Sequence, residues 1–250
     1  MNEKKQIWTE NYKISSYLVN MKNRAGLYSI LNLVQDVGWL HGIHLEVQLP
    51  KNQNWVFTRQ KLVMEQWPVW NEIVTIRTWL RPPLGAFLLR DYEILIGDRK
   101  IGECTSTFGI MDLLTRKIVV SDWQNFPNVW RHEEHVNQTP SKIILTNPMT
   151  DLAQFPVRNS DLDMNNHVNN TKYAQWILDA VPLDPIKNEL AIRVYEVNFL
   201  AEAKAGELVK IQRTPTVTSV PPLALTQFQG IRSFDGKPLF AAEIQVSQAN

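Results

Sequence analysis

Apolar residues along this chain change twice from helical spacing to strand-like alternation. Between Arg24 and Gly42 they recur at intervals of three and four, which predicts an amphipathic helix ending near Gly42. A weaker alternation from Ile7 to Tyr17 precedes this helix and is typical of an edge strand. The strands expected after the helix are residues 55–64, 73–80, 87–96 and 100–111.

The second half of the chain repeats this order. A polar loop leads to a helix expected over about Val168–Val181. The strands expected after it are residues 191–200, 206–214, 223–233 and 239–247. The segment around Glu72 matches the segment around Glu207, an offset of 135 residues (207 − 72), and this offset superposes Gln35 on Asn170. The pattern therefore predicts a tandem duplication.

This order of elements predicts an α+β fold. Antiparallel strands that follow a long helix can form a sheet that curls around it. Turns at Gly97–Asp98 and Asp235–Gly236 join the last two strands of each half. We expect a double hotdog, which is two tandem units, each a long helix wrapped by a curved antiparallel sheet. The expected division is an N-terminal unit at 1–130, a linker at 131–150 and a C-terminal unit at 151–250.

Composition and charge narrow the class of protein. The net charge is +1 over 250 residues, so we expect neither a nucleic-acid partner nor a membrane partner. We also expect a cytoplasmic protein, because the N-terminus lacks the apolar core of a signal peptide and no stretch approaches a membrane span. Cys104 is the single cysteine and is expected to be a buried small hydrophobe. A homo-oligomer is compatible with all of this.

The candidate chemistry lies where the polar loop meets the second helix. Asp163, Asn165 and His167 alternate there, so an extended backbone would point all three side chains the same way. A carboxylate, an amide and an imidazole together can orient and deprotonate a water molecule. Backbone N–H groups at the helix start can hold a developing oxyanion. The alternative interpretation is that the Asp and Asn residues only cap the helix.

Short sequence motifs in both halves resemble those of a known protein family. In the second half they are Ser160-Asp161-Leu162-Asp163, Asn165, His167-Val168-Asn169-Asn170, Lys172-Tyr173 and Trp176. In the first half they are Trp55-Val56, Thr58-Arg59, Pro68, Trp70, Thr78-Trp79 and Arg90-Asp91. From about residue 10 to residue 245, the chain resembles the fatty acyl-acyl-carrier-protein thioesterases of the FatA/FatB type, in a bacterial-like form.

The resemblance implies hydrolysis of the thioester of fatty acyl-acyl carrier protein in fatty acid biosynthesis, with no cofactor and no metal. The catalytic Asp, Asn and His of the family fall on Asp163, Asn165 and His167. Its Glu-Cys pair falls on Glu202 and Ala203, so the family cysteine is missing. We therefore expect direct attack by a water molecule that Glu202 and His167 position and deprotonate. Asp163 is expected to fix Asn165 or the loop.

The resemblance also implies how the substrate binds. Asn165, or backbone N–H groups near Val168 and Asn169, is expected to hold the thioester oxygen. The first unit is expected to lack the polar loop, because an offset of 135 puts Tyr28, Ile30 and Asn32 in place of the catalytic three. It is expected to hold the acyl chain instead. The side chains expected to line that site are Trp39, Trp55, Phe57 and Trp79.

Acyl carrier protein is the expected partner, and a basic rim is expected to face it because carrier proteins are acidic. The candidates for this rim are Lys172, Arg193 and Lys204, although a solvated surface explains each of them equally well. Three other functions stay open: an acyl-coenzyme A thioesterase, a hotdog hydratase or dehydratase, and a non-catalytic carrier-binding module. The segment His132–His135 resembles a zinc motif but lacks the required helical spacing, so no metal is expected.

Overall fold

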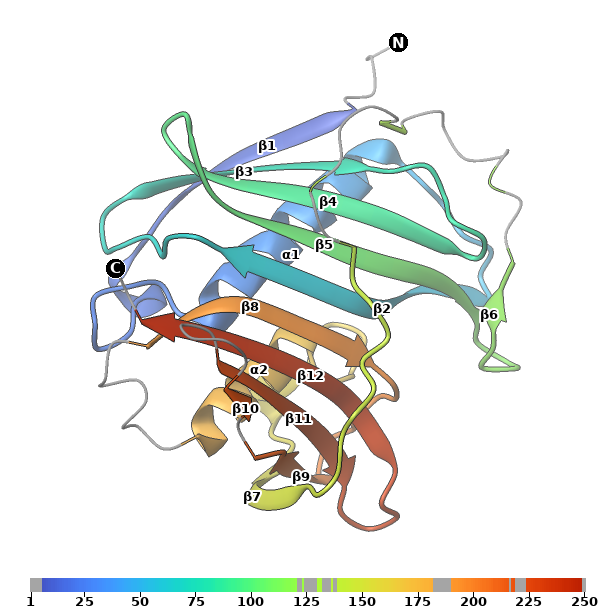
Figure 1. Cartoon of the computed structure of the whole chain (residues 1–250). Helices are drawn as coiled ribbons and strands as arrows, with labels where there is room; N and C mark the ends of the chain where they lie inside the picture. Colours follow the sequence, from blue (N-terminus) through green and yellow to red (C-terminus); the bar gives the residue numbers. More distant parts are fainter. Residues whose placement is uncertain are drawn as a thin grey trace. The chain divides into compact units, whose positions relative to one another are not determined.

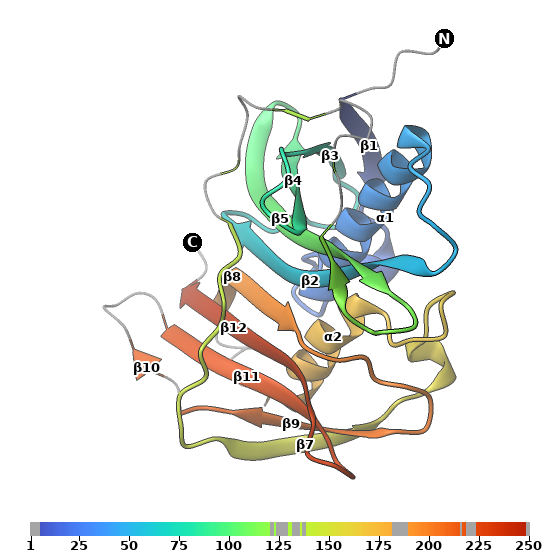
Figure 2. The same ribbon diagram turned by 90° about the vertical axis from the view of Figure 1, so that its right-hand side faces the viewer.

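The computed structural model of the chain describes residues 6–120, 123, 130, 131, 136, 139–181, 190–215, 217, 218 and 224–248. These residues belong to two compact units, Met1–Pro140 (unit 1) and Ser141–Asn250 (unit 2). Each unit has an antiparallel sheet with a helix along one face of it (Figure 1; Figure 2). This arrangement confirms the predicted α+β class.

Unit 1 is built around the helix α1 (Leu27–Leu45). Its sheet has the strand order β1-β3-β4-β5-β2, and β6 pairs with β5. The strands are β1 (Ile7–Lys13), β2 (Gln53–Met64), β3 (Ile73–Leu80), β4 (Phe87–Ile96), β5 (Arg99–Asp112) and β6 (Ile118–Val119). Ile30, Val34 and Val37 on α1 are fully buried, so the apolar face of the helix forms the core of the unit.

Unit 2 repeats this plan around a shorter helix, α2 (Asn170–Ala180). The order of its sheet is β8-β12-β11-β9-β7, and β10 pairs with β11. The strands are β7 (Thr150–Pro156), β8 (Leu190–Phe199), β9 (Leu208–Arg213), β10 (Val217–Thr218), β11 (Ala224–Arg232) and β12 (Pro238–Gln248). Tyr173 on α2 packs against Phe199 and Phe240, which ties the helix to β8 and β12.

One prediction about these elements is wrong, and one strand was missed. The first helix does not end near Gly42 but continues to Leu45, and Glu46 then takes the left-handed conformation with φ of 53°. Helices tolerate a glycine in their interior at a cost of about 1 kcal/mol, so Gly42 alone is no stop signal. The strand β7 was not predicted, because it pairs only with β9 and its alternation is weak. The edge strand β1 and the bounds of β3 and β4 are confirmed.

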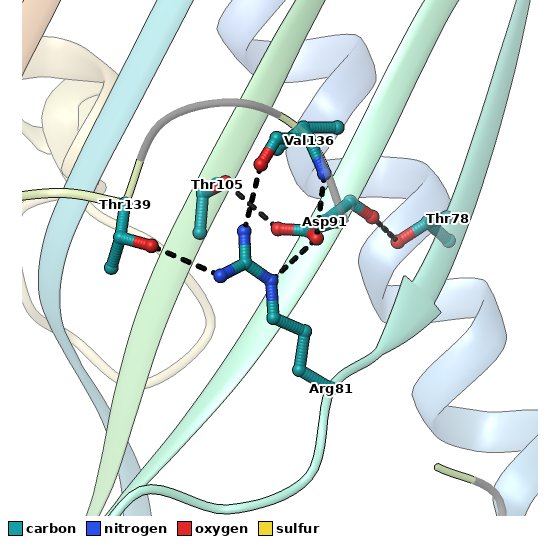
Figure 3. Close-up of polar contacts among 6 residues, drawn as sticks. All are labelled: Thr78, Arg81, Asp91, Thr105, Val136 and Thr139. Atoms are coloured by element: carbon teal, nitrogen blue, oxygen red, sulfur yellow. Dashed lines mark hydrogen bonds and ion pairs between the residues drawn. The ribbon is translucent and has the colours of Figure 1, made fainter. Parts of the chain in front are cut away.

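The face of the unit 1 sheet opposite α1 carries a buried polar cluster (Figure 3). Asp91 on β4 accepts hydrogen bonds from Arg81 Nε at 2.6 Å and from Thr105 Oγ1 at 2.8 Å. The backbone N–H of Val136 also donates to Asp91, while Arg81 donates to the carbonyl of Val136. These contacts hold Val136 against this face of the sheet.

Candidate active site

The loop with the predicted chemistry is a tight turn. Leu162 and Val168 form an antiparallel bridge at its base, and the N–H of Asp163 donates to the carbonyl of His167 at 2.8 Å. Asn166, at the tip, has a left-handed φ of 61°. The prediction of an extended backbone with three parallel side chains is therefore wrong.

The carboxylate of Asp163 explains the turn. Its Oδ1 accepts the N–H of Asn165 at 2.8 Å and the N–H of His167 at 3.3 Å. Short acidic side chains form such local bonds readily, and these bonds compete with extended structure. Asp163 therefore fixes the loop, which is one of the two roles expected for it.

The turn brings His167 close to Glu202. Their Nδ1 and Oε1 atoms lie 3.5 Å apart, and both side chains are about one third exposed. Glu202 follows β8 and lies in the connection to β9, because the N–H groups of Leu200 and Ala201 both donate to the carbonyl of Leu239 and end the strand. Two residues separated by 35 positions thus meet at the start of α2, as the family pattern implied.

Backbone hydrogen bonds at the helix start change the expected oxyanion site. The N–H of Val168 donates to the carbonyl of Ala203 at 3.3 Å, and the N–H of Asn169 donates to the carbonyl of Asp161 at 2.8 Å. A backbone N–H has one hydrogen, so the prediction that these two groups hold the thioester oxygen is not supported. Asn169 instead caps α2, because its side chain accepts the N–H of Thr171.

Two other donors remain near the turn. The side chain of Asn165 is exposed and makes no hydrogen bond with the described residues. The N–H of Asn170, the first residue of α2, likewise donates to no described residue. An N–H at this helix position points out of the helix start and carries part of its positive dipole. Asn170 was not predicted, because only the structure shows which N–H groups are already used.

The position of the missing family cysteine is buried. Ala203 has no exposed surface, and it lies next to Tyr173, which is buried too. Burial raises the pKa of the Tyr173 phenol, and the negative charge of Glu202 raises it further, so this side chain stays neutral. Cys104 on β5 is 1% exposed, which confirms the prediction of a buried small side chain.

Unit 1 contains the same loop with different side chains, so the prediction that it lacks the loop is wrong. Val19 bridges Ala25, the N–H of Asn20 donates to the carbonyl of Arg24, and Asn23 has φ of 59°. The helices begin at Leu27 and Asn170, 143 residues apart (170 − 27). The matched pairs are therefore Asn20 with Asp163, Lys22 with Asn165, and Arg24 with His167.

The error came from the length of the helices. Strands β3 and β9 begin at Ile73 and Leu208, so the offset of 135 residues holds there (208 − 73). Helix α1 has 19 residues and α2 has 11, and this difference of eight separates the two offsets. The superposition of Gln35 on Asn170 is therefore eight residues out of step. With the offset of the strands, Trp67 and Pro68 of unit 1 match Glu202 and Ala203.

The four aromatic residues expected to bind the acyl chain have different environments in unit 1. Trp79 is 2% exposed, whereas Trp39 on α1 is 55% exposed. Trp55 stacks with Trp123 and Phe57 packs edge-on against Phe108, and both are half-buried. The structure thus places Trp79 in the core and Trp39 on the surface. Acyl-chain binding by these residues stays a prediction.

The candidates for a basic rim are also unlike one another. Lys172 lies 3.8 Å from Asp161 and donates to Gln175, and Arg193 donates to Ser247 on β12. Lys204 is exposed, two residues after Glu202. The zinc-like segment His132–His135 lies outside the described residues. Among the residues that are described, no group of three or more His, Cys, Asp or Glu side chains is placed to hold a metal, and no helix is long and apolar enough to cross a bilayer.

The sequence matches two family models, one for each unit. The model of the acyl-ACP thioesterase N-terminal domain matches residues 5–122, and the model of the C-terminal domain matches residues 147–233. Together with a hotdog unit that holds an imidazole–carboxylate pair at its helix start, these matches define the class. The chain belongs to the acyl-ACP thioesterase family.

Plant proteins are among its relatives. The chloroplastic palmitoyl-acyl carrier protein thioesterase of Gossypium hirsutum is 27% identical over 205 residues, which cover 71% of this chain and 48% of that protein. The chloroplastic oleoyl-acyl carrier protein thioesterase of Coriandrum sativum is 27% identical over 237 residues, covering 84% and 63%. The chain thus spans about half to two thirds of the length of these relatives.

Solved structures agree on the fold. An acyl-ACP thioesterase from Bacteroides thetaiotaomicron has a TM-score of 0.83 at 20% identity, covering 97% of this chain and 98% of that one. A 12:0-ACP thioesterase from Umbellularia californica has a TM-score of 0.86 at 17% identity, covering 98% and 95%. A Mycobacterium tuberculosis protein described as a double hotdog has a TM-score of 0.62 at 7% identity, covering 98% and 96%. The predicted double hotdog is confirmed.

Proposed function

We propose that this protein hydrolyses the thioester of fatty acyl-acyl carrier protein, releasing a free fatty acid and the carrier thiol in fatty acid biosynthesis. The observation that carries the proposal is the distance of 3.5 Å between Nδ1 of His167 and Oε1 of Glu202, beside the start of α2. Family membership supports the substrate class. The reaction needs an activated water, and an imidazole oriented by a carboxylate is a suitable base for it.

In this mechanism Glu202 accepts a hydrogen bond from Nδ1–H of His167, so the Nε2 atom keeps its lone pair and takes a proton from water. The hydroxide attacks the carbonyl carbon, the C–S bond breaks, and the imidazolium returns the proton to the leaving thiolate. A well-placed general base contributes a rate factor of about 10²–10⁴. No sulfur nucleophile takes part, since residue 203 is alanine.

The carbonyl oxygen gains negative charge during the attack. We assign its stabilisation to the Asn165 amide and the N–H of Asn170, since neither donates to another described residue. One such donor contributes about 3–4 kcal/mol to the stability of the transition state. Asp163 contributes indirectly, through the two N–H groups that it accepts in the turn.

We assign the acyl chain to unit 1, because its aromatic side chains can bury hydrocarbon at about 0.8 kcal/mol per CH₂ group. Acyl carrier protein is the proposed partner, and the cytoplasm is the proposed location. A single, buried cysteine suits a reducing compartment.

The test is a panel of saturated acyl chains of graded length, each offered on acyl carrier protein and on coenzyme A. Free fatty acid and released thiol are measured together. We expect His167→Ala and Glu202→Ala to lower turnover at least about 100-fold. Met164→Ala is the matched control, because Met164 lies in the same turn with its side chain 80% exposed.

The outcomes separate the rival functions. Faster release from the carrier than from coenzyme A supports the proposal, and the reverse indicates an acyl-coenzyme A thioesterase. Water addition to an unsaturated chain without release of thiol indicates a hydratase. Unchanged turnover in both His167→Ala and Glu202→Ala would contradict the site.

A further inference from the structure

Asp161 is a buried carboxylate at the base of the reactive turn that the proposed mechanism does not use. It is 7% exposed and lies immediately before the bridged residue Leu162. Its Oδ2 accepts the N–H of Arg158 at 2.8 Å, which caps the short 3-10 turn Asn159–Asp161. Its Oδ1 lies 3.8 Å from Nζ of Lys172 in the first turn of α2. One side chain thus touches both the segment before the loop and the helix after it.

The backbone of Asp161 closes the same connection. Its carbonyl accepts the N–H of Asn169 at 2.8 Å, and Asn169 is the residue that caps α2. His167 lies two residues before Asn169, inside the segment that these contacts enclose. The orientation of the His167 imidazole therefore depends on how firmly the two ends of the loop are held.

Lys172 is an unusual residue for its position. It is the third residue of α2, where the helix dipole favours negative charge, and a cation there is unfavourable by about 0.3–1 kcal/mol. The nearby Asp161 offsets this cost. A residue that is unfavourable for its local structure, next to a neighbour that offsets its cost, is often found at a functional site.

Unit 1 provides an internal comparison. Its loop keeps the backbone bond, because the N–H of Gly26 donates to the carbonyl of Leu18 at 3.1 Å. Leu18 stands at the position of Asp161, and Ser29 stands at the position of Lys172. The loop backbone therefore closes without a carboxylate–ammonium pair. That pair is found in the unit that brings an imidazole and a carboxylate together.

We propose that Asp161 and Lys172 are positioning residues, whose contact holds the loop so that His167 faces Glu202. This inference rests on the proposed function, because it assigns His167 the role of base. Neither residue needs to touch the substrate. Their effect is on the geometry of the imidazole, and small displacements of a catalytic group cost up to about 100-fold in rate.

The variants are chosen to remove the ion pair of Asp161 and Lys172 while keeping the hydrogen bond that caps the 3-10 turn. Asp161→Asn keeps an oxygen for the N–H of Arg158 but removes the charge that faces Lys172, and Lys172→Met removes the other charge at similar length. We expect each variant to lower kcat about tenfold with KM within about twofold. The double variant should also lose about tenfold, not about a hundredfold, because both changes remove one interaction. Lys172→Arg, which keeps the charge, should restore most of the rate.

Two further measurements distinguish positioning from folding. Asp179→Asn is the control, since Asp179 is an exposed carboxylate of α2 that also feels the charge of Lys172. It should leave kcat unchanged. The ring signals of His167 are recorded by NMR at one fixed pH, and Asp161→Asn should shift these signals without lowering the fraction folded.

The NMR readout needs no turnover, so it judges this inference even if the proposed function fails. If His167→Ala hydrolyses the thioester as fast as the parent protein, His167 is not the base, while shifted His167 ring signals in Asp161→Asn still support the positioning of the ring. If Asp161→Asn and Lys172→Met leave both kcat and the His167 ring signals as in the parent protein, the positioning role is wrong.

Discussion

Asn20 in unit 1 and Asp163 in unit 2 make the same two hydrogen bonds. The Oδ1 atom of Asn20 accepts the N–H of Lys22 at 2.9 Å and of Arg24 at 3.3 Å, and Oδ1 of Asp163 accepts the N–H of Asn165 at 2.8 Å and of His167 at 3.3 Å. An amide oxygen can therefore build this turn as well as a carboxylate. The turn belongs to the scaffold, whereas the side chains presented on it differ between the units.

This relationship predicts how Asp163 tolerates substitution. Asp163→Asn keeps an oxygen at the right place, so we expect the turn to persist and turnover to fall less than about tenfold. Asp163→Ala removes the acceptor of two N–H groups, which costs about 1–3 kcal/mol and displaces Asn165 and His167. We expect it to lower kcat about 100-fold or more. Steady-state kinetics on acyl-acyl carrier protein tests this, with circular dichroism to verify folding.

The activities of Asp163→Asn and Asp163→Ala are compared with each other. If Asp163→Asn loses as much activity as Asp163→Ala, then the negative charge takes part in the chemistry, and the structural role is insufficient. Asn20→Ala in unit 1 is the matched control, because it breaks the equivalent turn in the unit that does not contain His167 and Glu202. It should lower stability and leave kcat near that of the parent protein.

The sequence supplied the candidate site residues but not their arrangement. The residue types at 163, 165, 167 and 202 carry the family pattern, so they could be named in advance. The turn could not be predicted, because the alternation of Asp163, Asn165 and His167 favoured an extended strand. The structure instead has a turn in which the Asp163 side chain accepts the N–H groups of the other two residues. The contact of Val168 with Ala203 joins segments 35 residues apart, and no local propensity specifies such a contact. It also withdraws an N–H group from the expected oxyanion site.

The fold shows the same division between local and distant information. The bounds of β3 and β4 were predicted because strand alternation and turn residues mark both ends. The position of Tyr28, Ile30 and Asn32 relative to the catalytic three was wrong, since a repeat that is in step over the strands is shifted by eight residues over the helices. The equivalent loop of unit 1 was recognised from its matching hydrogen bonds and not from matching residue types.

The stability of the protein should fall in alkaline solution, partly through Cys104. The thiol is 1% exposed, and desolvation raises its pKa. In the unfolded chain the pKa of a cysteine thiol is about 8.5. The unfolded chain therefore loses this proton at a lower pH than the folded protein does. The stabilisation is therefore complete below about pH 8.5 and is lost above it, by up to about 1.4 kcal/mol per pH unit.

Cys104→Ala tests this dependence. Urea unfolding under reducing conditions at pH 8 and at pH 10 gives the free energy of unfolding of both proteins. We expect the parent protein to lose more stability over this interval than the variant, by up to about 2 kcal/mol. Buried tyrosines such as Tyr195, whose pKa is raised by burial alone, affect both proteins equally. Parallel pH profiles would show that the thiol does not contribute.

Two glycines of α1 should respond oppositely to alanine. A Cβ atom on Gly42 would meet nothing within 4 Å, so Gly42→Ala should stabilise the helix by about 0.5–1 kcal/mol. A Cβ atom on Gly38 would lie 2.7 Å from the hydroxyl of Tyr92, so Gly38→Ala should overpack the core and cost about 1–3 kcal/mol. Urea unfolding of the two variants measures the difference. Adding Tyr92→Phe to Gly38→Ala should recover part of the loss, and no recovery would mean that the hydroxyl is not the obstacle.

The buried ion pair of Arg81 and Asp91 should matter far more for stability than a neighbouring, partly exposed pair. Asp91 is fully buried, and besides Arg81 it accepts hydrogen bonds from Thr105 and Val136 (Figure 3). Asp91→Ala leaves the Arg81 guanidinium without this partner and should cost about 3–5 kcal/mol. Glu93→Ala breaks the partly exposed pair with Arg77 on the same strand pairing and should cost less than about 1 kcal/mol.

Urea unfolding of the two variants measures both costs, and a double variant provides the control. The double variant with Arg81→Met and Asp91→Ala no longer contains a guanidinium that lacks the Asp91 carboxylate. It should therefore recover part of the lost stability. The recovery should be incomplete, since Thr105 and the N–H of Val136 still lose their acceptor. Equal losses for Asp91→Ala and Glu93→Ala would contradict the distinction between the buried and the partly exposed pair.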